Sequence, residues 1–379
     1  MLEIIRAGKR ASGPVLAALL ACAATGHADQ IEYTAYYFGD NNDNTVATTS
    51  FSLAKTLWRR TMILLDVELD QTTVPPLDGV TGASRPARQS KTEFRKNRGQ
   101  IIGGVEQGLG ENTKVVASYY FSQEPDYQSE SFIGGVTREF FRKNFTVSLR
   151  AQYTMDSVGE ILANGTISNL FKETHQASLI LTQLLSPTTI LRVGGDAVRN
   201  HGYLSDPYRK VPLPTANPLV DDTVSERHPG MRYRQAAWGE ISQYLNGLEA
   251  SLIFHYRYYW DDWGVTSHTG SLKINKYVTK DWIFSPEYRY YEQTAADFGE
   301  YGRANPGGYD AEDYKLKMFS SNNAGAGVTC FLRAFSRNHP TWDFLNNSSI
   351  SVMYFRYFND TAPDNFSANV LESRLKFTF

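Results

Sequence analysis

The sequence predicts an all-β fold, namely a transmembrane antiparallel β-barrel of about sixteen strands with short periplasmic turns and long outer loops. Three observations predict it. Segments of about ten residues that alternate apolar and polar side chains recur along the chain. Aromatic residues make up 13% of the 379 residues, including 23 Tyr, while the mean hydropathy is −0.40. No apolar run of about 18 residues follows the N-terminal region, so transmembrane helices are not expected there.

Residues 1–28 are predicted to be a cleaved signal peptide. Lys9 and Arg10 precede a short apolar core at 13–25, and small residues at the end of the segment suit cleavage before Asp29. The apolar core is too short for an uncleaved membrane anchor. A barrel that follows an export signal is expected in the outer membrane of a Gram-negative bacterium.

A lipoprotein remains an alternative for the same region. The sequence LLAC at 19–22 loosely resembles a lipobox, so Cys22 is either lipidated or removed with the signal. In the second case Cys330 is the only cysteine of residues 29–379, which are expected to form the barrel, and no internal disulfide can form. The net charge of −2 is too near neutral for a nucleic-acid-binding protein, so no nucleic-acid partner is expected.

Sixteen segments carry the alternating pattern and are predicted to be strands. Short turns follow the even-numbered strands, whereas the long polar segments at 73–97, 156–171, 199–231 and 293–313 follow odd-numbered ones. This asymmetry is typical of barrels with periplasmic turns and outer loops, and it places both termini in the periplasm. The segment 333–347 is an exception, because it is too long for a turn. The predicted strands lie near 30–39, 46–56, 61–72, 98–108, 113–123, 129–140, 144–155, 172–184, 188–198, 232–245, 248–260, 265–276, 281–292, 314–332, 348–358 and 370–379.

The last predicted strand shows the alternation most clearly. Its polar face, with Glu372 and Arg374, is expected to line the lumen, and its apolar face is expected to meet the lipid bilayer. A soluble β-sandwich would also alternate, but the polar faces here carry many charges and large Tyr side chains. Phe379, Phe377 and Leu375 resemble the terminal aromatic signature that outer-membrane assembly machinery recognises. That machinery is therefore an expected partner.

Charged residues on the predicted lumen faces are the candidate functional residues. Acids come from the third and fourth strands and arginines from the seventh to the fifteenth, so facing walls would carry opposite charge. Glu249, Asp261 and Glu287 share the basic wall, so the charges could instead pair and fill the lumen. The lumen-lining candidates are Asp66, Glu68, Asp70, Glu106, Arg150, Arg192, Arg257, Arg289 and Arg356.

A short aromatic and basic motif recurs in the second half of the chain. Tyr-Arg-Tyr-Tyr occurs at 256–259 and at 288–291, and Phe-Arg-Tyr-Phe at 355–358 is a looser copy. Each copy is expected to turn its Arg inward and aromatic rings outward. One interpretation is an aromatic girdle with charge pairs that fill the lumen, and the other is an arginine ladder along a solute path. Asp-Asp-Trp-Gly at 261–264 is expected to form a tight hairpin connection.

Signals for a metal site or for catalysis are weak. Five Pro residues in the segment 199–231 favour a stiff outer loop, and no ligand spacing there matches a known metal motif. Neither GxSxG nor HExxH occurs, so we expect no enzyme, no cofactor and no metal. A membrane-embedded hydrolase stays as an alternative because catalytic triads follow geometry and not sequence order. The residues of that segment whose side chains could bind a metal are His201, Asp206, Asp221, Asp222 and His228.

Five segments carry a family resemblance: TGAS at 81–84, SDPYRKV at 205–211, HPGMRYRQ at 228–235, YRYYWDDWGVTSHT at 256–269 and PEYRYYEQTAADF at 286–298. Together they resemble a family of predicted Gram-negative outer-membrane β-barrel proteins catalogued as a domain of unknown function. The segment that contains DDWG is the most specific. The resemblance covers nearly all of the exported chain and implies the barrel and its location. Genes of the family often lie beside flavin-transferase and redox genes, which implies a redox protein as a candidate partner.

Three hypotheses for function follow. A barrel of about sixteen strands leaves an aqueous lumen unless side chains or loops fill it, so the leading one is a porin-like channel or translocation pore for small hydrophilic solutes. The second is a structural or scaffolding barrel that holds a periplasmic or surface partner, such as a redox protein. The third is the membrane-embedded hydrolase.

Overall fold

The computed structural model describes most of the predicted barrel. The described residues are 29–74, 94–159, 168–212, 223–298, 308–311, 313–336, 342, 345–359 and 366–379. The predicted signal peptide, the TGAS motif at 81–84 and the pair Asp221 and Asp222 lie outside them. Within these ranges, no helix has the length and apolar character needed to cross a membrane.

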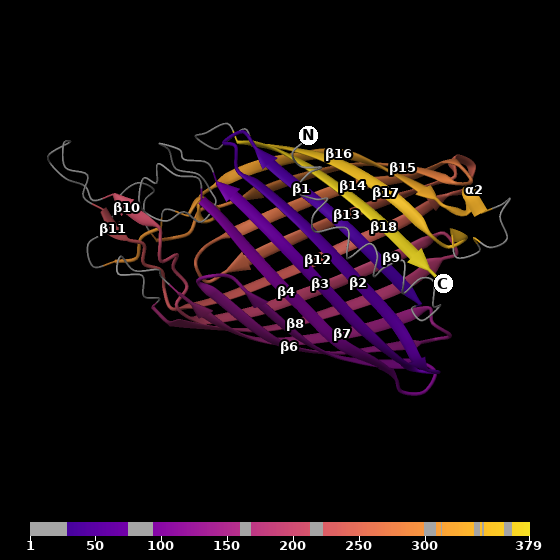
Figure 1. Cartoon of the computed structure of the whole chain (residues 1–379), viewed down its shortest axis with the longest axis horizontal. Coiled ribbons are helices and arrows are strands. Elements are labelled where there is room, and N and C mark those ends of the chain that lie inside the picture. The colour runs from indigo at the N-terminus through magenta and orange to yellow at the C-terminus, as the bar shows by residue number, and fades with distance from the viewer. Residues whose placement is uncertain are drawn as a thin grey trace.

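Sixteen antiparallel strands close into one barrel, which confirms the predicted fold class and strand number. Each barrel strand pairs with the next along the chain, and β1 pairs with β18, so the described sheet has no open edge. A small two-stranded sheet between β9 and β12 projects beyond one end of the barrel (Figure 1). The barrel strands are β1 (Gln30–Asp40), β2 (Thr45–Trp58), β3 (Thr61–Val74), β4 (Phe94–Gly108), β5 (Thr113–Gln123), β6 (Tyr127–Phe140), β7 (Phe145–Val158), β8 (Leu170–Ser186), β9 (Thr189–Gly202), β12 (Met231–Leu245), β13 (Ala250–Asp261), β14 (Thr266–Thr279), β15 (Trp282–Gln293), β16 (Phe319–Phe331), β17 (Ser349–Phe358) and β18 (Ser367–Thr378), and the small sheet is β10 (Lys210–Pro212) and β11 (Thr223–Ser225).

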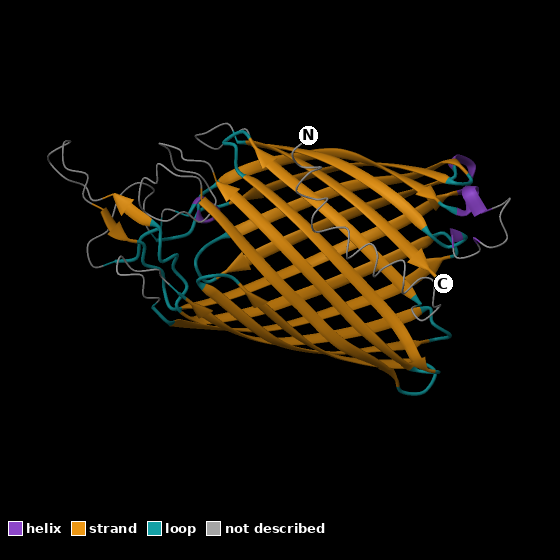
Figure 2. Ribbon diagram, in the orientation of Figure 1, coloured by secondary structure: helices purple, strands orange, loops and turns teal. Residues whose placement is uncertain are grey.

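The two ends of the barrel differ (Figure 2). At one end, which we call the turn end, connections such as 59–60, 187–188 and 280–281 are very short. Both ends of the described chain meet here, because the backbone N–H of Phe379 donates to the carbonyl of Asp29 at 3.1 Å. At the other end, the loop end, lie β10, β11 and the connection between β15 and β16.

Three short helices interrupt the connections that the structure describes. The exceptional segment 333–347 lies at the turn end between β16 and β17 and begins with a helix, α2 (Arg333–Ser336). The N–H of the Arg333 side chain donates to Asp281 at 2.7 Å, so α2 is held against the neighbouring turn. The other two are single 3-10 turns, η1 (Asn246–Leu248) at the turn end and η2 (Tyr314–Leu316) at the loop end.

Alternation sorts each strand into a lumen face and an exterior face. Residues directly opposite each other in an antiparallel ladder point to the same side. On β7, Leu149 lies opposite Val136 and Leu179, and all three are exposed apolar side chains of the exterior. The next residue, Arg150, lies opposite Ser178 on the lumen face. On β7 the lumen face is therefore the polar one.

Large aromatic side chains gather on the exterior toward both ends of the strands. Such rings prefer the boundary between hydrocarbon and water, because one part of the ring is apolar and another is polar. The exposed members are Trp58, Phe141 and Trp282 near the turn end, and Tyr119, Phe132, Tyr233, Tyr256, Tyr288, Tyr290 and Tyr354 toward the loop end.

Candidate functional site

Acidic side chains of β3 form a hydrogen-bonded row on the lumen face. Asp70 accepts a hydrogen bond from Arg98 Nε at 2.6 Å and one from the Thr48 hydroxyl at 2.5 Å. Glu68 accepts from Gln100 Nε2 at 2.6 Å and lies 3.3 Å from Arg98 Nη2. The β3–β4 register brings these pairs together, because Asp70 is opposite Arg98 and Glu68 is opposite Gln100. One arginine therefore serves two carboxylates.

This row borders a lumen cavity of about 880 Å³. Beyond β2, the same stretch of wall continues with β1 and β18, where Arg374 lies 3.3 Å from Glu32 and 2.8 Å from Glu372. Lys315, from the connection between β15 and β16, reaches the same space. Ion-paired charges thus surround a space of many water volumes, and they do not fill it. The remaining lining residues are Thr34, Tyr36, Val46, Thr48, Ser50, Thr72, Lys96 and Glu124.

The other two acidic candidates lie on the same wall but in different surroundings. Glu106 is paired with Lys114 of β5 at 2.8 Å near the turn end. Asp66 faces the lumen opposite Ile102 and Ser52, and it makes no ion pair within the described ranges. The register therefore places all four acidic candidates on the lumen face.

The wall from β7 to β15 carries the arginine candidates together with acids. Arg192 lies 3.2 Å from Glu240, and Arg257 lies 3.8 Å from Asp196. Lys273 and Glu287 form another pair at 3.3 Å. Many charges on this wall are therefore paired, as the lumen-filling interpretation expects.

Arg150 and Arg289 differ from these pairs. Both face the lumen and are exposed there, and neither has a carboxylate partner in the described part of the chain. The arginines that the sequence singled out thus include paired members and members whose charge is not balanced locally.

Arg356 corrects one expectation, because it lies on the exterior. It is opposite Ala324, and Ala324 is opposite Tyr288, an exposed exterior tyrosine. The strand β17 turns Tyr354 outward in the same register, so the looser motif copy at 355–358 is shifted by one residue relative to the two Tyr-Arg-Tyr-Tyr copies. Arg356 therefore does not line the lumen.

Asp261 organises the loop end of β12 and β13. Its carboxylate accepts hydrogen bonds from Arg232 Nε at 2.9 Å and from the Tyr259 hydroxyl at 2.5 Å. It also accepts from the backbone N–H groups of Trp263 and Val265, each at 3.0 Å. These two bonds hold the Asp-Asp-Trp-Gly connection, in which Gly264 adopts φ +83°, so the expected tight hairpin is present.

Trp263 lies at the centre of a small apolar cluster over the barrel mouth. It is buried together with Val265, Ala311 and Leu316, so the cluster joins the β13–β14 connection to the segment before β16. The Arg232 guanidinium lies 4.3 Å from the centre of the indole ring. Packing here holds two loop-end connections together.

A second polar cluster ties down the connection between β9 and β12. Glu226, whose side chain is fully buried, lies 3.2 Å from His228 Nε2 and 3.5 Å from Arg209. Arg209 also lies 3.1 Å from Asp313, and His228 Nδ1 lies 3.1 Å from the carbonyl of Leu204. Burial alone would raise the pKa of Glu226, but contact with His228 and the charge of Arg209 outweigh it and lower that pKa.

The distinctive sequence motifs therefore meet in one place. SDPYRKV supplies Arg209, HPGMRYRQ supplies His228 and Arg232, and the segment with DDWG supplies Asp261 and Trp263. Sequence reasoning did not select Arg232 or Arg234 as functional candidates. The basic character of HPGMRYRQ was the available signal, but its partner Asp261 lies 29 residues further on. We call this arrangement the loop-end cap.

The described residues of the segment 199–231 that could bind a metal do not form one site: Asp206 and His228 lie in the Arg209–Glu226 cluster, and His201 lies elsewhere. His201 is exposed beside Glu173 on the exterior-facing register, whereas His228 is buried in the cap. Asp206 accepts the backbone N–H of Tyr208 at 2.9 Å and lies near Arg209. Within the described ranges, no group of three or more His, Cys, Asp or Glu is arranged to hold a metal ion.

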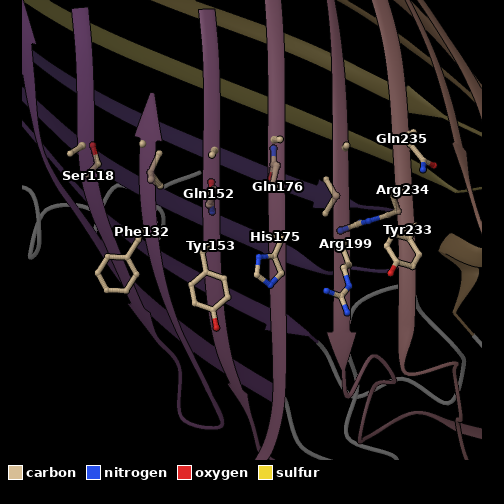
Figure 3. A pocket seen from close by; sticks show the side chains of 17 residues that line it. Ser118, Phe132, Gln152, Tyr153, His175, Gln176, Arg199, Tyr233, Arg234 and Gln235 are labelled. Carbon is tan, nitrogen blue, oxygen red and sulfur yellow. The ribbon is translucent and has the colours of Figure 1, made fainter. Parts of the chain in front are cut away.

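A hollow of about 710 Å³ lies on the exterior of β5 to β9, with Tyr233 of β12 at its end. Its floor consists of small residues that lie opposite one another on neighbouring strands. Phe132, Tyr153, His175 and Arg199 stand beside Tyr233 along one side (Figure 3). The rings of Tyr153 and His175 are 4.8 Å apart. The floor residues are Ala117, Gly134, Ala151, Ala177 and Ala197.

Solved structures with a similar fold are outer-membrane proteins. A bacterial polysaccharide outer membrane secretin has a TM-score of 0.50 and 9% identity, with 93% of this chain and 99% of that chain covered. A mutant ferric enterobactin receptor of Pseudomonas aeruginosa and the siderophore receptor PirA of Acinetobacter baumannii have TM-scores of 0.47 at 13% and 12% identity, each covering 88% of this chain. The chain spans about half the length of those receptors, 53% of each. At such identities the likeness shows the fold alone.

Sequence comparison assigns the family. No curated protein matches the chain. The family model described as protein of unknown function (DUF3570) matches residues 79–172 and 163–338, which together make up more than half of the 379 residues. This match confirms the resemblance drawn from the motifs, and the chain therefore belongs to the DUF3570 family.

Proposed function

We propose that the barrel lies in the outer membrane and is a channel for small hydrophilic solutes. One observation carries the proposal: a closed ring of sixteen strands encloses a lumen whose walls are polar and whose cavity of about 880 Å³ is lined by both signs of charge. Barrels of this size leave an aqueous passage unless it is filled. The exposed apolar exterior and its aromatic residues near both ends support a position in a bilayer. The loop end then faces outward and the turn end faces the periplasm.

Single-channel recording in planar bilayers tests the proposal directly. Purified full-length protein should produce discrete conductance steps, and a salt gradient should give a reversal potential that reports ion selectivity. The variant Asp66→Asn/Glu68→Gln/Asp70→Asn removes three negative charges from one wall and leaves Arg98 without its carboxylates. We expect its selectivity to move toward anions. The shift should be largest at about 0.01 M salt, where the Debye length is about 30 Å, and small at 1 M, where it is about 3 Å.

A matched control removes the same number of acids from the exterior. Glu130, Glu173 and Glu292 share the register of the exposed exterior residues, and each accepts a hydrogen bond from a neighbouring tyrosine hydroxyl. The variant Glu130→Gln/Glu173→Gln/Glu292→Gln should keep the wild-type selectivity, because these charges do not face the lumen. Equal shifts in both triple variants would mean that the recorded current does not pass through this lumen.

The other two hypotheses apply if no conductance is found. Correctly assembled wild-type protein that shows no conductance would refute the channel. A scaffolding barrel would then be favoured, and crosslinking in intact cells should capture a periplasmic or surface protein, with redox proteins as the first candidates. A hydrolase would instead require turnover of an ester or amide substrate by the purified barrel.

A further inference from the structure

Four arginines lie along the lumen face from the loop-end cap toward the interior of the barrel, and we call them the arginine track. Arg232 and Arg234 come from β12, Arg257 from β13 and Arg289 from β15. Arg257 is opposite Thr269, which is opposite Tyr291, so Arg257 and Tyr291 lie at one level about 10 Å apart across β14. Arg289 lies one step deeper on the same face.

The carboxylates around this track do not balance its charge. Asp261 is saturated by Arg232, Tyr259 and two backbone N–H groups. Asp196 is held at 2.7 Å by the Ser178 hydroxyl and reaches Arg257 only at 3.8 Å. Among the described residues, four guanidinium groups thus face two carboxylates, which leaves a surplus of two positive charges.

Arg234 and Arg289 account for this surplus. Neither makes a hydrogen bond or an ion pair with a protein group in the described part of the chain, and Arg234 Nε is buried without any partner. An unpaired buried N–H is costly, and unneutralised guanidinium groups repel one another. Such costs are relieved when an anion binds, because the planar fork of Arg matches two oxygens of a carboxylate or a phosphate.

Aromatic rings fix the orientation of the track. The Arg257 guanidinium lies 5.9 Å from the centre of the Tyr259 ring, and Arg289 lies 5.9 Å from that of Tyr291. Each tyrosine follows its arginine by two residues in a Tyr-Arg-Tyr-Tyr copy, so the repeated motif builds the same pair twice on the lumen face. A guanidinium that lies against a ring loses little further freedom when it binds an anion.

We propose that this arginine track is an anion-binding site, and that the solute of the barrel carries at least one carboxylate or phosphate group. The statement about the solute rests on the proposed channel function, whereas anion binding at the arginine track does not require that the barrel conducts. Passage would proceed from Arg234, beneath the cap, to Arg257 and then to Arg289, with the anion transferred between arginines as in other multi-site pores.

Isothermal titration calorimetry on the full-length protein in detergent, at about 50 mM salt, tests the site without any current. Inorganic pyrophosphate and citrate are the probes for phosphate and carboxylate, and sucrose is the uncharged probe. The wild type should bind the two anions and not sucrose. Raising the salt to about 1 M should weaken binding, because the Debye length falls to about 3 Å.

The variant Arg234→Gln/Arg289→Gln removes the two arginines without protein partners and so leaves no carboxylate unpaired. We expect anion affinity to fall about a hundredfold, or tenfold for each charged hydrogen-bonding group removed. The matched control Arg199→Gln/Arg356→Gln removes two arginines from the exterior and should keep the wild-type affinity. Heat-modified migration on gels checks that each barrel is folded. Arg289→Gln, at an exposed lumen position, provides the same test should the double variant not fold.

Three results would overturn the proposal: a folded wild type that binds neither anion, equal losses in the lumen and exterior variants, or sucrose binding as tight as that of the anions. Selective binding of only one anion would support the site and name its group. The outcome is separable from that of the channel. Anion binding without conductance refutes only the channel, and a conducting barrel whose current neither anion blocks, and which binds neither, refutes only the anion site.

Discussion

An arginine at Leu149 should destabilise the barrel by about 2–4 kcal/mol if this face meets lipid. Leu149 is the fifth residue of β7, and its side chain is 53% exposed on the exterior. Four steps of about 3.4 Å along a strand tilted by about 40° place it about 10 Å from the turn end. The apolar band of such barrels is about 25 Å tall, so Leu149 lies near its middle, where a charge is most costly.

The comparison is an arginine one residue away. Ser148 faces the lumen and shares a hydrogen bond of 3.0 Å with Thr137, whose loss costs about 1 kcal/mol. Arg at this position would lie about 7 Å from Arg150, which adds about 0.6 kcal/mol of repulsion in water. The total destabilisation of about 1.6 kcal/mol at position 148 includes the charge repulsion, which salt screens. The destabilisation at position 149 comes from transfer of the charge into lipid, which salt does not reduce.

Reversible folding into lipid vesicles provides the measurement. Tryptophan fluorescence across a guanidinium series gives the free energy of unfolding of Leu149→Arg, Ser148→Arg and the size control Leu149→Ala. Leu149→Arg should be the least stable of the three, and only Ser148→Arg should gain stability between about 0.1 and 1 M potassium chloride. Equal losses for the two arginine variants, with the same salt response, would refute the assignment of the two faces.

Three further predictions concern assembly and the loop-end cap. Deletion of Phe379, whose ring stacks on that of Phe377 at 6.4 Å, should lower the amount of heat-modifiable barrel in the outer membrane, and unchanged assembly would contradict its role as a signal. The pKa of Glu226 is lowered in the folded protein, so its contribution to stability should be complete above about pH 4.3, the pKa of an unperturbed Glu, and should vanish as the pH falls through the lowered pKa of the folded state. Protease cleavage of the cap should therefore increase only at acidic pH, and Glu226→Gln should abolish that pH dependence. Asp261→Ala leaves Arg232 as an unpaired, largely buried charge and should lower the free energy of unfolding by about 3–5 kcal/mol. Asp261→Asn is the milder control, and equal stability of the two variants would contradict the prediction.

The alternation of side chains determined most of the barrel in advance. A period of two can be recognised within a single strand, because the pleat sends successive side chains to opposite faces whatever the neighbouring strand is. The predicted strand number and the order of short and long connections were therefore correct without knowledge of any contact. The predicted last strand at 370–379, with Glu372 and Arg374 facing inward, matches β18 in its register.

Arg356 shows where local pattern and motif disagreed. The alternation of Ile350, Val352 and Tyr354 continues outward through Arg356, whereas the likeness of 355–358 to Tyr-Arg-Tyr-Tyr suggested the opposite face. The alternation was the better guide, because burial in a sheet depends on the position within the pleat and a four-residue likeness does not set that position.

Only the tertiary structure decided which charges pair and which stay free. Arg232, Arg234 and Arg289 each lie next to a tyrosine in the sequence, yet Arg232 is bound to Asp261, 29 residues away, and Arg234 and Arg289 make no hydrogen bond or ion pair in the described ranges. Pairing depends on the register of neighbouring strands and on loops that fold over the barrel mouth, and neither is encoded within a single strand. The sequence by itself therefore determined the barrel and its two faces, whereas strand register and the folding of the loops determined which lumen charges are paired.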